Sequence, residues 1–234
     1  NQYDNLMNAD AHYQSTGPEI WRQSGGAVDY FVASGSTGGT ISGVGRYLKE
    51  QKSEVKVLMP DPIGSIYYTY FKTGRIDESE IGSYQVEGIG EDMVCGALEF
   101  DHIDDVIQVT DRECFLMSRR LVREEGLFAG GSSGGAARGA ANLARGLGRN
   151  YTIVAMLPDS GAIYLSKYLD DGWMKDNGFT EHDWATQTVG DLLLRLPRRR
   201  VLCAKSTDTI ADAVAQMKEH GVSQLPVVDN GALT

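Results

Sequence analysis

The chain has 234 residues, a hydrophobic fraction of 41%, a charged fraction of 23% and a formal net charge of −10. This composition is typical of a globular protein of one domain or slightly more. No apolar run approaches the ~20 residues that a membrane span needs, so we expect no membrane partner. An acidic surface repels phosphate backbones, which argues against nucleic acid as a partner.

Neither the cysteines nor the histidines have the spacing of a disulfide framework or a metal site. The three cysteines form no C-x-x-C pair, and the four histidines form no H-E-x-x-H pair. We therefore predict no bound metal and a reducing, cytoplasmic location.

Short apolar strands alternate with helices through the first three quarters of the chain. The pattern Thr16-Gly-Pro-Glu19 predicts a capping box at the start of a helix. Strands are predicted at residues 28–33, 55–59, 106–109 and 152–157, the second of them closed by Pro60 and Pro62. Helices are predicted to about residue 50, from a capping box at 110–113 to about residue 125, and after residue 135. Repeated βα units of this kind predict an α/β fold, with a parallel or mixed sheet and flanking helices.

The first chemical motif is a glycine-rich turn between the predicted strand at 28–33 and its helix. It consists of Ser36, Thr37, Gly38, Gly39 and Thr40. Glycines let several backbone N–H groups point inward, and the helix start adds positive potential, so the turn could hold a phosphate. No Gly-Lys-Ser/Thr follows, so it is not a Walker loop. The alternative is an ordinary strand-to-helix turn.

A second glycine-rich turn spans residues 130–135. It contains Gly130-x-Ser132-x-Gly134, which matches the nucleophile elbow of serine hydrolases, and Asp159 and His182 follow in the order Ser, Asp, His. A serine hydrolase that uses Ser132 is therefore one alternative. A close packing turn without chemistry is another.

Two weaker signals complete the set. Gly88, Ile89 and Gly90, followed by Glu91, should place flexible backbone beside a pocket. Pro158 and Asp159 follow the last predicted strand, at the sheet edge where open α/β sheets bind ligands. Either signal alone predicts only a turn.

The regular alternation of predicted strands and helices ends after residue 179. Residues up to 198 have no clear period, which suits a linker. Beyond them Ile210, Val214 and Met217 share one face of a predicted helix that ends at Gly221, and a strand is predicted at 225–228. About 30 residues are too few for an independent core, so this unit is expected to be incomplete.

In their order and spacing, these motifs resemble the β-family (fold type II) of pyridoxal-phosphate enzymes, which includes cysteine synthase and cystathionine β-synthase. The resemblance covers about residues 1–178. It is closer to the cystathionine β-synthases, since residues 87–92 are similar to their E-G-I-G-x-D segment. The pattern from Thr207 to Asp229 is also similar to the first half of a Bateman (CBS) module.

The resemblance implies three regions. Residues 1–178 would be the C-terminal portion of a catalytic domain with the tryptophan-synthase-β-like fold, residues 179–198 a linker, and residues 199–234 the start of a truncated Bateman module. Residues 36–40 would hold the phosphate of pyridoxal 5′-phosphate, Ser132 would meet its pyridine nitrogen, and Pro158 and Asp159 would lie near the ring. Residues 88–91 would line the substrate pocket.

The implied reaction is β-replacement, in which serine and homocysteine give cystathionine and water, or a cysteine synthase-type replacement. The implied partners are amino-acid and thiol substrates, an adenosyl effector at the Bateman module, and a second copy of the chain. Two features depart from the family. The Schiff-base lysine is expected upstream in a Ser-x-Lys segment, so no residue of this chain is assigned as catalytic, and Glu91 stands where better-known members carry Tyr. A non-enzymatic adenosyl-ligand sensor remains an alternative.

Overall fold

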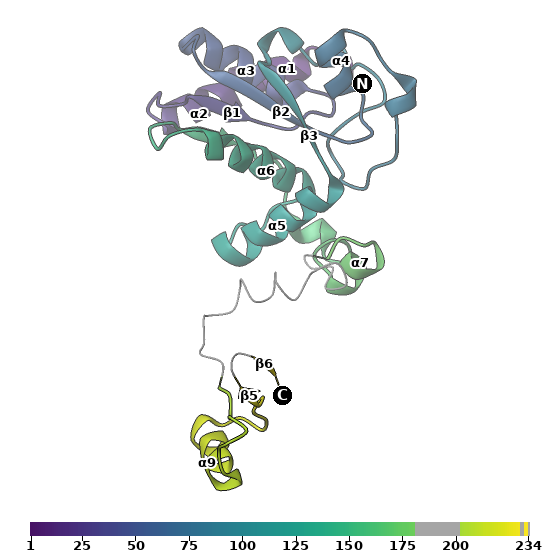
Figure 1. The fold of residues 1–234 in the computed structure, drawn as a ribbon. Coiled ribbons are helices and arrows are strands. Elements are labelled where there is room, and N and C mark those ends of the chain that lie inside the picture. Colours follow the sequence, from purple (N-terminus) through teal and green to yellow (C-terminus); the bar gives the residue numbers. More distant parts are fainter. Residues whose placement is uncertain (181–201, 230–231, 234) are drawn as a thin grey trace. The chain divides into compact units, whose positions relative to one another are not determined.

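The computed structural model describes residues 1–180, 202–229 and 232–233. The chain divides into two units, Asn1–Glu181 and His182–Thr234. The helices and strands of each unit are shown in Figure 1.

The first unit is built on a parallel sheet. Its strands are β1 (Tyr30–Val32), β2 (Lys56–Pro62), β3 (Asp105–Val109) and β4 (Ile153–Ala155). They lie in the order β3-β2-β1-β4, and every pairing is parallel. All four coincide with predicted strands, so the predicted α/β class with a parallel sheet is confirmed.

Helices cover both faces of this sheet, as Figure 1 shows. One face carries α1 (Met7–Gln14), α2 (Thr16–Gln23) and α3 (Gly39–Gln51), and the other carries α5 (Asp111–Glu125) and α6 (Gly131–Gly146). Two shorter helices also occur: α4 (Tyr67–Thr73) follows β2, and α7 (Asp171–Asp176) lies near the C-terminal end of the unit. Single 3-10 turns occur at Glu78–Glu80, Phe100–His102 and Gly161–Tyr164.

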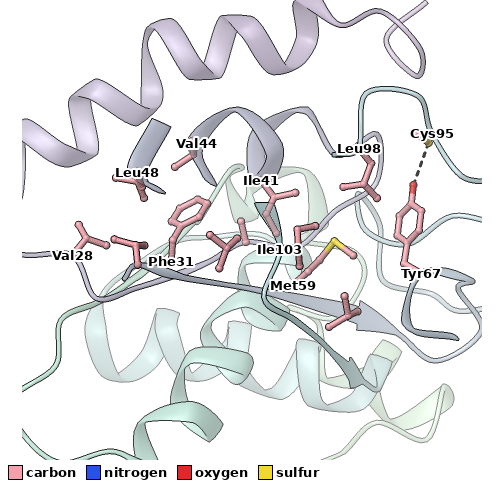
Figure 2. Close-up of a cluster of buried hydrophobic side chains, with 14 of the residues drawn as sticks. Val28, Phe31, Ile41, Val44, Leu48, Met59, Tyr67, Cys95, Leu98 and Ile103 are labelled. Atoms are coloured by element: carbon pink, nitrogen blue, oxygen red, sulfur yellow. Dashed lines mark hydrogen bonds between the residues drawn. The ribbon is translucent and has the colours of Figure 1, made fainter. Parts of the chain in front are cut away.

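The larger hydrophobic core fills the space between α3 and the sheet. Phe31 and Met59 from the strands meet Ile41, Val44 and Leu48 from α3, as Figure 2 shows. All five side chains are fully buried. Burying an aliphatic or aromatic side chain of this size contributes roughly 1.5–3 kcal/mol, so this layer fixes the position of α3 and of the turn that precedes it.

One predicted capping box exists and the other does not. At α5 the Thr110 hydroxyl accepts from the Glu113 N–H at 3.2 Å and the Glu113 carboxylate accepts from the Thr110 N–H at 3.0 Å, as predicted. The box predicted at Thr16 is wrong, since α2 has Ser15 as its N-cap and no side-chain cap. The Thr16 hydroxyl lies instead 2.9 Å from Nδ1 of His12 in the preceding helix.

Strand β2 runs on through the two prolines that were predicted to close it, so that prediction is wrong. Successive residues of β2 direct their backbone groups alternately toward β1 and toward β3. The Lys56 N–H donates to the carbonyl of Asp29, which precedes β1, whereas the Ile63 N–H donates to the carbonyl of Val109 in β3. Pro60 and Pro62 share the parity of Lys56, so their missing N–H groups face the side on which β1 has already ended. The prolines therefore cost the sheet no ladder bond with β3.

The second unit contains the predicted helix, α9 (Ile210–His220). Thr209 caps its start by accepting from the Asp212 N–H at 3.1 Å, and Gly221, with φ 62°, ends it as predicted. The strand predicted at 225–228 lies slightly later, as β5 (Val228–Asp229), and pairs with β6 (Ala232–Leu233). Ile210, which lies on the predicted apolar face of α9, is 85% exposed. Most of the predicted linker lies outside the described residues, so its boundaries stay a prediction.

Across the described parts of both units, no helix combines the length and the apolar character that a bilayer crossing needs.

Candidate functional site

A pocket of about 120 Å³ opens at the carboxyl ends of β1 and β4. Chain order reverses at this point of the sheet, because β1 leads to β2 on one side while β4 returns on the other. Ligands of open α/β sheets bind in the crevice at such a switch point. The lining residues are Ser34, Ser36, Thr37, Gly38, Gly39, Thr40, Gly88, Ile89, Ser132, Met156 and Pro158.

The turn at residues 36–40 supplies nearly half of this lining. Gly38 has φ 84° and is the N-cap of α3, and no side chain caps the helix start. A Cβ on Gly38 would lie 2.5 Å from Cβ of Leu98. Only glycine combines this conformation with this close approach. The result is a turn that presents backbone at the positive end of a 13-residue helix, which favours an anion.

Two side chains of α1 hold the threonines of this turn. Asn8 Nδ2 donates to Thr37 Oγ1 at 3.0 Å, and His12 Nε2 lies 3.1 Å from Thr40 Oγ1. Burial lowers the pKa of His12, so the ring is neutral at pH 7. Neither Asn8 nor His12 was predicted to be part of the site. Both precede the first predicted strand, and no local spacing relates them to the turn.

The segment that contains Gly88, Ile89 and Gly90 reaches the same pocket. Gly88 and Ile89 line it, and the Gly90 N–H donates to Gly35 O at 2.7 Å, so this segment is joined to the loop that follows β1. Glu91 does not line the pocket, but its carboxylate accepts a hydrogen bond from the Ser36 hydroxyl. The structure therefore brings two of the predicted motifs together, the turn at residues 36–40 and the segment at 88–90.

Ser132 comes from a distant part of the chain, at the start of α6, but it lines the same pocket. It is the second residue of α6, is 4% exposed, and lines the pocket together with Pro158 and Met156. Met156 follows β4 directly and was not predicted to be part of the site.

Asp159 is placed beside α6 and not in the pocket lining. Its carboxylate accepts from the Tyr164 hydroxyl at 2.8 Å and from the Ser133 hydroxyl at 3.5 Å, and its backbone carbonyl accepts from the Gly130 N–H at 3.2 Å. These contacts hold the start of α6, so Asp159 orients the helix that carries Ser132.

Ser34 also lines the pocket, although it was not predicted to be part of the site. Its hydroxyl is buried and has no hydrogen-bond partner among the described residues. A buried hydroxyl without a partner is costly, and a polar ligand in the pocket would relieve that cost. The signal available in the sequence was its place directly after the strand at 28–33.

The hydrolase alternative finds little support in this geometry. Ser132 lies within the first turn of a regular helix, and Asp159 is bonded to Tyr164 and Ser133. A nucleophile elbow instead holds its serine on a strained turn between strand and helix. His182, the third member of the predicted relay, lies outside the described residues.

Three further titratable residues, Tyr67, Cys95 and Asp61, are not part of the pocket lining. The Tyr67 hydroxyl donates to Ser36 O at 2.6 Å and lies 3.2 Å from Cys95 Sγ, the bond drawn in Figure 2. Asp61 is fully buried on β2, and this burial raises the pKa of its carboxyl group to about 7. One of its oxygens accepts from the Tyr68 N–H at 2.9 Å, whereas the other has no hydrogen-bond partner in the described structure.

Comparisons with known proteins match both units. A family model described as pyridoxal-phosphate dependent enzyme matches residues 1–159, and one described as CBS domain matches residues 189–234.

Among curated relatives, cystathionine beta-synthase of Dictyostelium discoideum is 38% identical over 97% of this chain and 46% of its own length. That of Apis mellifera is 41% identical over 98% of this chain and 45% of its own length. Cysteine synthase 1 of Neurospora crassa is 38% identical over 75% of this chain and 47% of its own length. The chain thus spans about half the length of the relatives it matches.

Proposed function

Because this chain belongs to the family of pyridoxal-phosphate dependent enzymes and continues into a CBS domain, we propose that the whole protein catalyses β-replacement on serine, with homocysteine as the incoming thiol. The products would be cystathionine and water. One observation carries the proposal: the turn at residues 36–40 and Ser132, far apart in the sequence, line a single pocket. The extent of the match to cystathionine beta-synthases, which includes the C-terminal unit, supports the choice of thiol.

The residues of the pocket fit the cofactor of this family. The uncapped start of α3 and the hydroxyls of Thr37 and Thr40 suit a phosphate group. A Cβ at Gly38 would collide with Leu98, so the turn requires glycine at this position. The Ser34 hydroxyl, which has no partner in the described structure, is available to a polar ligand in the same pocket.

Each part of the pocket would have a separate task. When bound, the cofactor supplies the electron sink that lets an amino acid lose its β-substituent. The Ser132 hydroxyl would meet the pyridine nitrogen as a neutral partner and leave it largely unprotonated, which weakens that sink and favours elimination over transamination. Gly88 and Ile89 would form the wall against which the amino acid lies.

No lysine is among the residues that line the described pocket. Five of the lysines in the first unit pair with carboxylates at the surface: Lys49, Lys52, Lys56, Lys72 and Lys167. We therefore place the lysine that anchors the cofactor in a segment outside this sequence, and we expect this chain by itself to be inactive.

The proposal is tested on the full-length protein. We expect a yellow protein in which borohydride fixes the cofactor to a lysine that this sequence does not contain, located by peptide mass spectrometry. A colourless protein whose Ser132 reacts with a fluorophosphonate would replace the proposal by the hydrolase alternative. The ratio of kcat/KM for homocysteine to that for sulfide separates cystathionine β-synthase from cysteine synthase chemistry.

For the C-terminal unit we propose a regulatory role, with an adenosyl compound as ligand. The observation behind this is the CBS domain match over residues 189–234. A ligand can alter catalysis only if it binds one arrangement of the protein better than another. Deleting everything after residue 179 from the full-length protein should preserve β-replacement and abolish any response to the adenosyl ligand. Loss of cofactor binding in this deletion would show instead that the unit is a structural part of the active domain.

A further inference from the structure

The carboxylate of Glu91 reaches the phosphate-type turn from a separate segment of the chain. Its Oε1 accepts a hydrogen bond from Ser36 Oγ at 2.5 Å. The backbone of Glu91 is held on both sides, because its N–H donates to Ser65 Oγ at 3.1 Å and its carbonyl accepts from the Ile66 N–H at 3.0 Å. The side chain is therefore directed at Ser36 by an anchored backbone.

This contact places a negative charge beside a turn whose other features favour an anion. None of the described residues that line the pocket is charged, so Glu91 is the acidic group in direct contact with the lining at this turn. A serine hydroxyl has a single proton to donate. While Ser36 donates it to Glu91, it cannot donate to a phosphate oxygen, and two anionic groups that share one donor also repel each other.

We propose that the Glu91 carboxylate competes with the phosphate group of the ligand for the Ser36 hydroxyl and so limits the affinity of the turn for phosphate. Occupation of the turn by phosphate then releases Glu91 from Ser36. The affinity for phosphate and the position of the Glu91 carboxylate are linked, because whatever favours one arrangement of Ser36 disfavours the other. This inference rests on the proposed function in so far as the phosphate belongs to the cofactor.

The contact between the two loops does not depend on this carboxylate alone. The Gly90 N–H donates to Gly35 O at 2.7 Å, and the Tyr67 hydroxyl donates to Ser36 O at 2.6 Å. Both bonds remain when the Glu91 side chain is changed. The variant Glu91→Gln, which keeps the shape and removes the charge, should therefore keep the pocket in place.

The chain offers a matched control in the same segment. Glu87 lies four residues before Glu91, and its carboxylate pairs with the ammonium of Lys167. Glu87→Gln removes the same charge from the protein. It tests whether a gain in affinity comes from the contact with Ser36 or from the net charge.

The experiment measures dissociation constants of the full-length apoprotein for pyridoxal phosphate, for inorganic phosphate and for pyridoxal at constant ionic strength. We expect Glu91→Gln to bind both phosphate ligands about tenfold more tightly, a change of about 1.4 kcal/mol. Its affinity for pyridoxal should be unchanged, and Glu87→Gln should match the wild type throughout. In a Ser36→Ala background, the gain from Glu91→Gln should be smaller, because the shared donor is gone.

Equal affinities of wild type and Glu91→Gln for inorganic phosphate would overturn the inference, as would an equal gain in Glu87→Gln or in pyridoxal binding. A wild-type protein that binds inorganic phosphate but not pyridoxal phosphate would contradict the proposed function and leave the competition at Ser36 intact. The two failures are therefore distinguishable.

Discussion

The imidazole of His12 connects the first helix of the protein to the turn at the start of α3, since its Nε2 lies 3.1 Å from Thr40 Oγ1. Its Nδ1 lies 2.9 Å from Thr16 Oγ1. A neutral imidazole has one donor and one acceptor, and both ring nitrogens are used. His12 thus fixes the direction of the Thr40 hydroxyl, which lines the pocket.

Replacing His12 by Phe keeps an aromatic ring of similar size and removes both hydrogen bonds. We expect the affinity for pyridoxal phosphate to fall about tenfold, because the Thr40 hydroxyl loses its fixed direction, at a cost of about 1.4 kcal/mol. Fluorescence titration of the full-length apoprotein measures this. The control is His220→Phe in the exposed last turn of α9, for which we expect no change. Unchanged binding in His12→Phe would show that Thr40 needs no support from α1.

Replacing Ser132 by Asp introduces a carboxylate at a position that is 4% exposed and lines the pocket. The charge should hold the pyridine nitrogen protonated, so we expect a shifted cofactor spectrum and a β-replacement rate at least about tenfold lower, equivalent to about 1.4 kcal/mol in the barrier. Ser132→Ala, which adds no charge, separates loss of the hydroxyl from the effect of the carboxylate. Full activity with an unchanged spectrum in Ser132→Asp would remove Ser132 from the proposed ring contact.

Replacing Gly38 by Ala strains the backbone at φ 84° and brings the new Cβ to 2.7 Å from Cα of Leu98. We expect the free energy of unfolding to fall by about 2 kcal/mol or more, since backbone atoms must move. Gly146→Ala is the control, because nothing lies within 4 Å of the added Cβ at the end of α6. A neutral or slightly stabilising effect is expected there, of about 0.5–1 kcal/mol at most. Denaturant unfolding compares the two, and equal effects would contradict the close approach at Gly38.

Replacing Asp61 by Asn should change how stability depends on pH. Burial raises the pKa of Asp61 from its ordinary value of 3.8 to about 7, so the folded state binds a proton more tightly than the unfolded chain does. The contribution of the Asp61 carboxyl group to the free energy of unfolding is greatest below about pH 4. It falls as the pH rises to about 7, by up to about 4 kcal/mol. The amide of the Asp61→Asn variant does not titrate, so this loss should disappear.

Urea denaturation at several pH values between about 4 and 8 measures this difference. The exposed Asp101 provides the control, because Asp101→Asn leaves Asp61 in place and should retain the wild-type dependence on pH. Parallel curves for wild type and Asp61→Asn would contradict the buried, protonated carboxyl group.

The local elements of this protein follow from short-range patterns in its sequence. Apolar runs bounded by turn residues predict all four strands of the sheet, and the capping box at Thr110 and the glycine at 221 predict where α5 starts and α9 ends. Such signals are readable because strand pairing, capping and left-handed turns place requirements on single residues or on residues three or four apart. The capping box at Thr16 failed because Ser15, one residue earlier, is the N-cap of α2, and the Thr16 hydroxyl instead lies beside His12 of the preceding helix.

The sequence by itself determined the parallel α/β class, the two glycine-rich turns and the residues that face the pocket from each: the 36–40 turn and Ser132. Only the tertiary structure decided what supports them. Asn8 and His12 hold the first turn from α1, Asp159 holds the start of α6, and Glu91 bonds to Ser36 across the loop. These contacts join residues far apart in the chain, and each of them involves a side chain. No period or spacing in the sequence records a contact of that kind, because it depends on how the helices pack against the sheet.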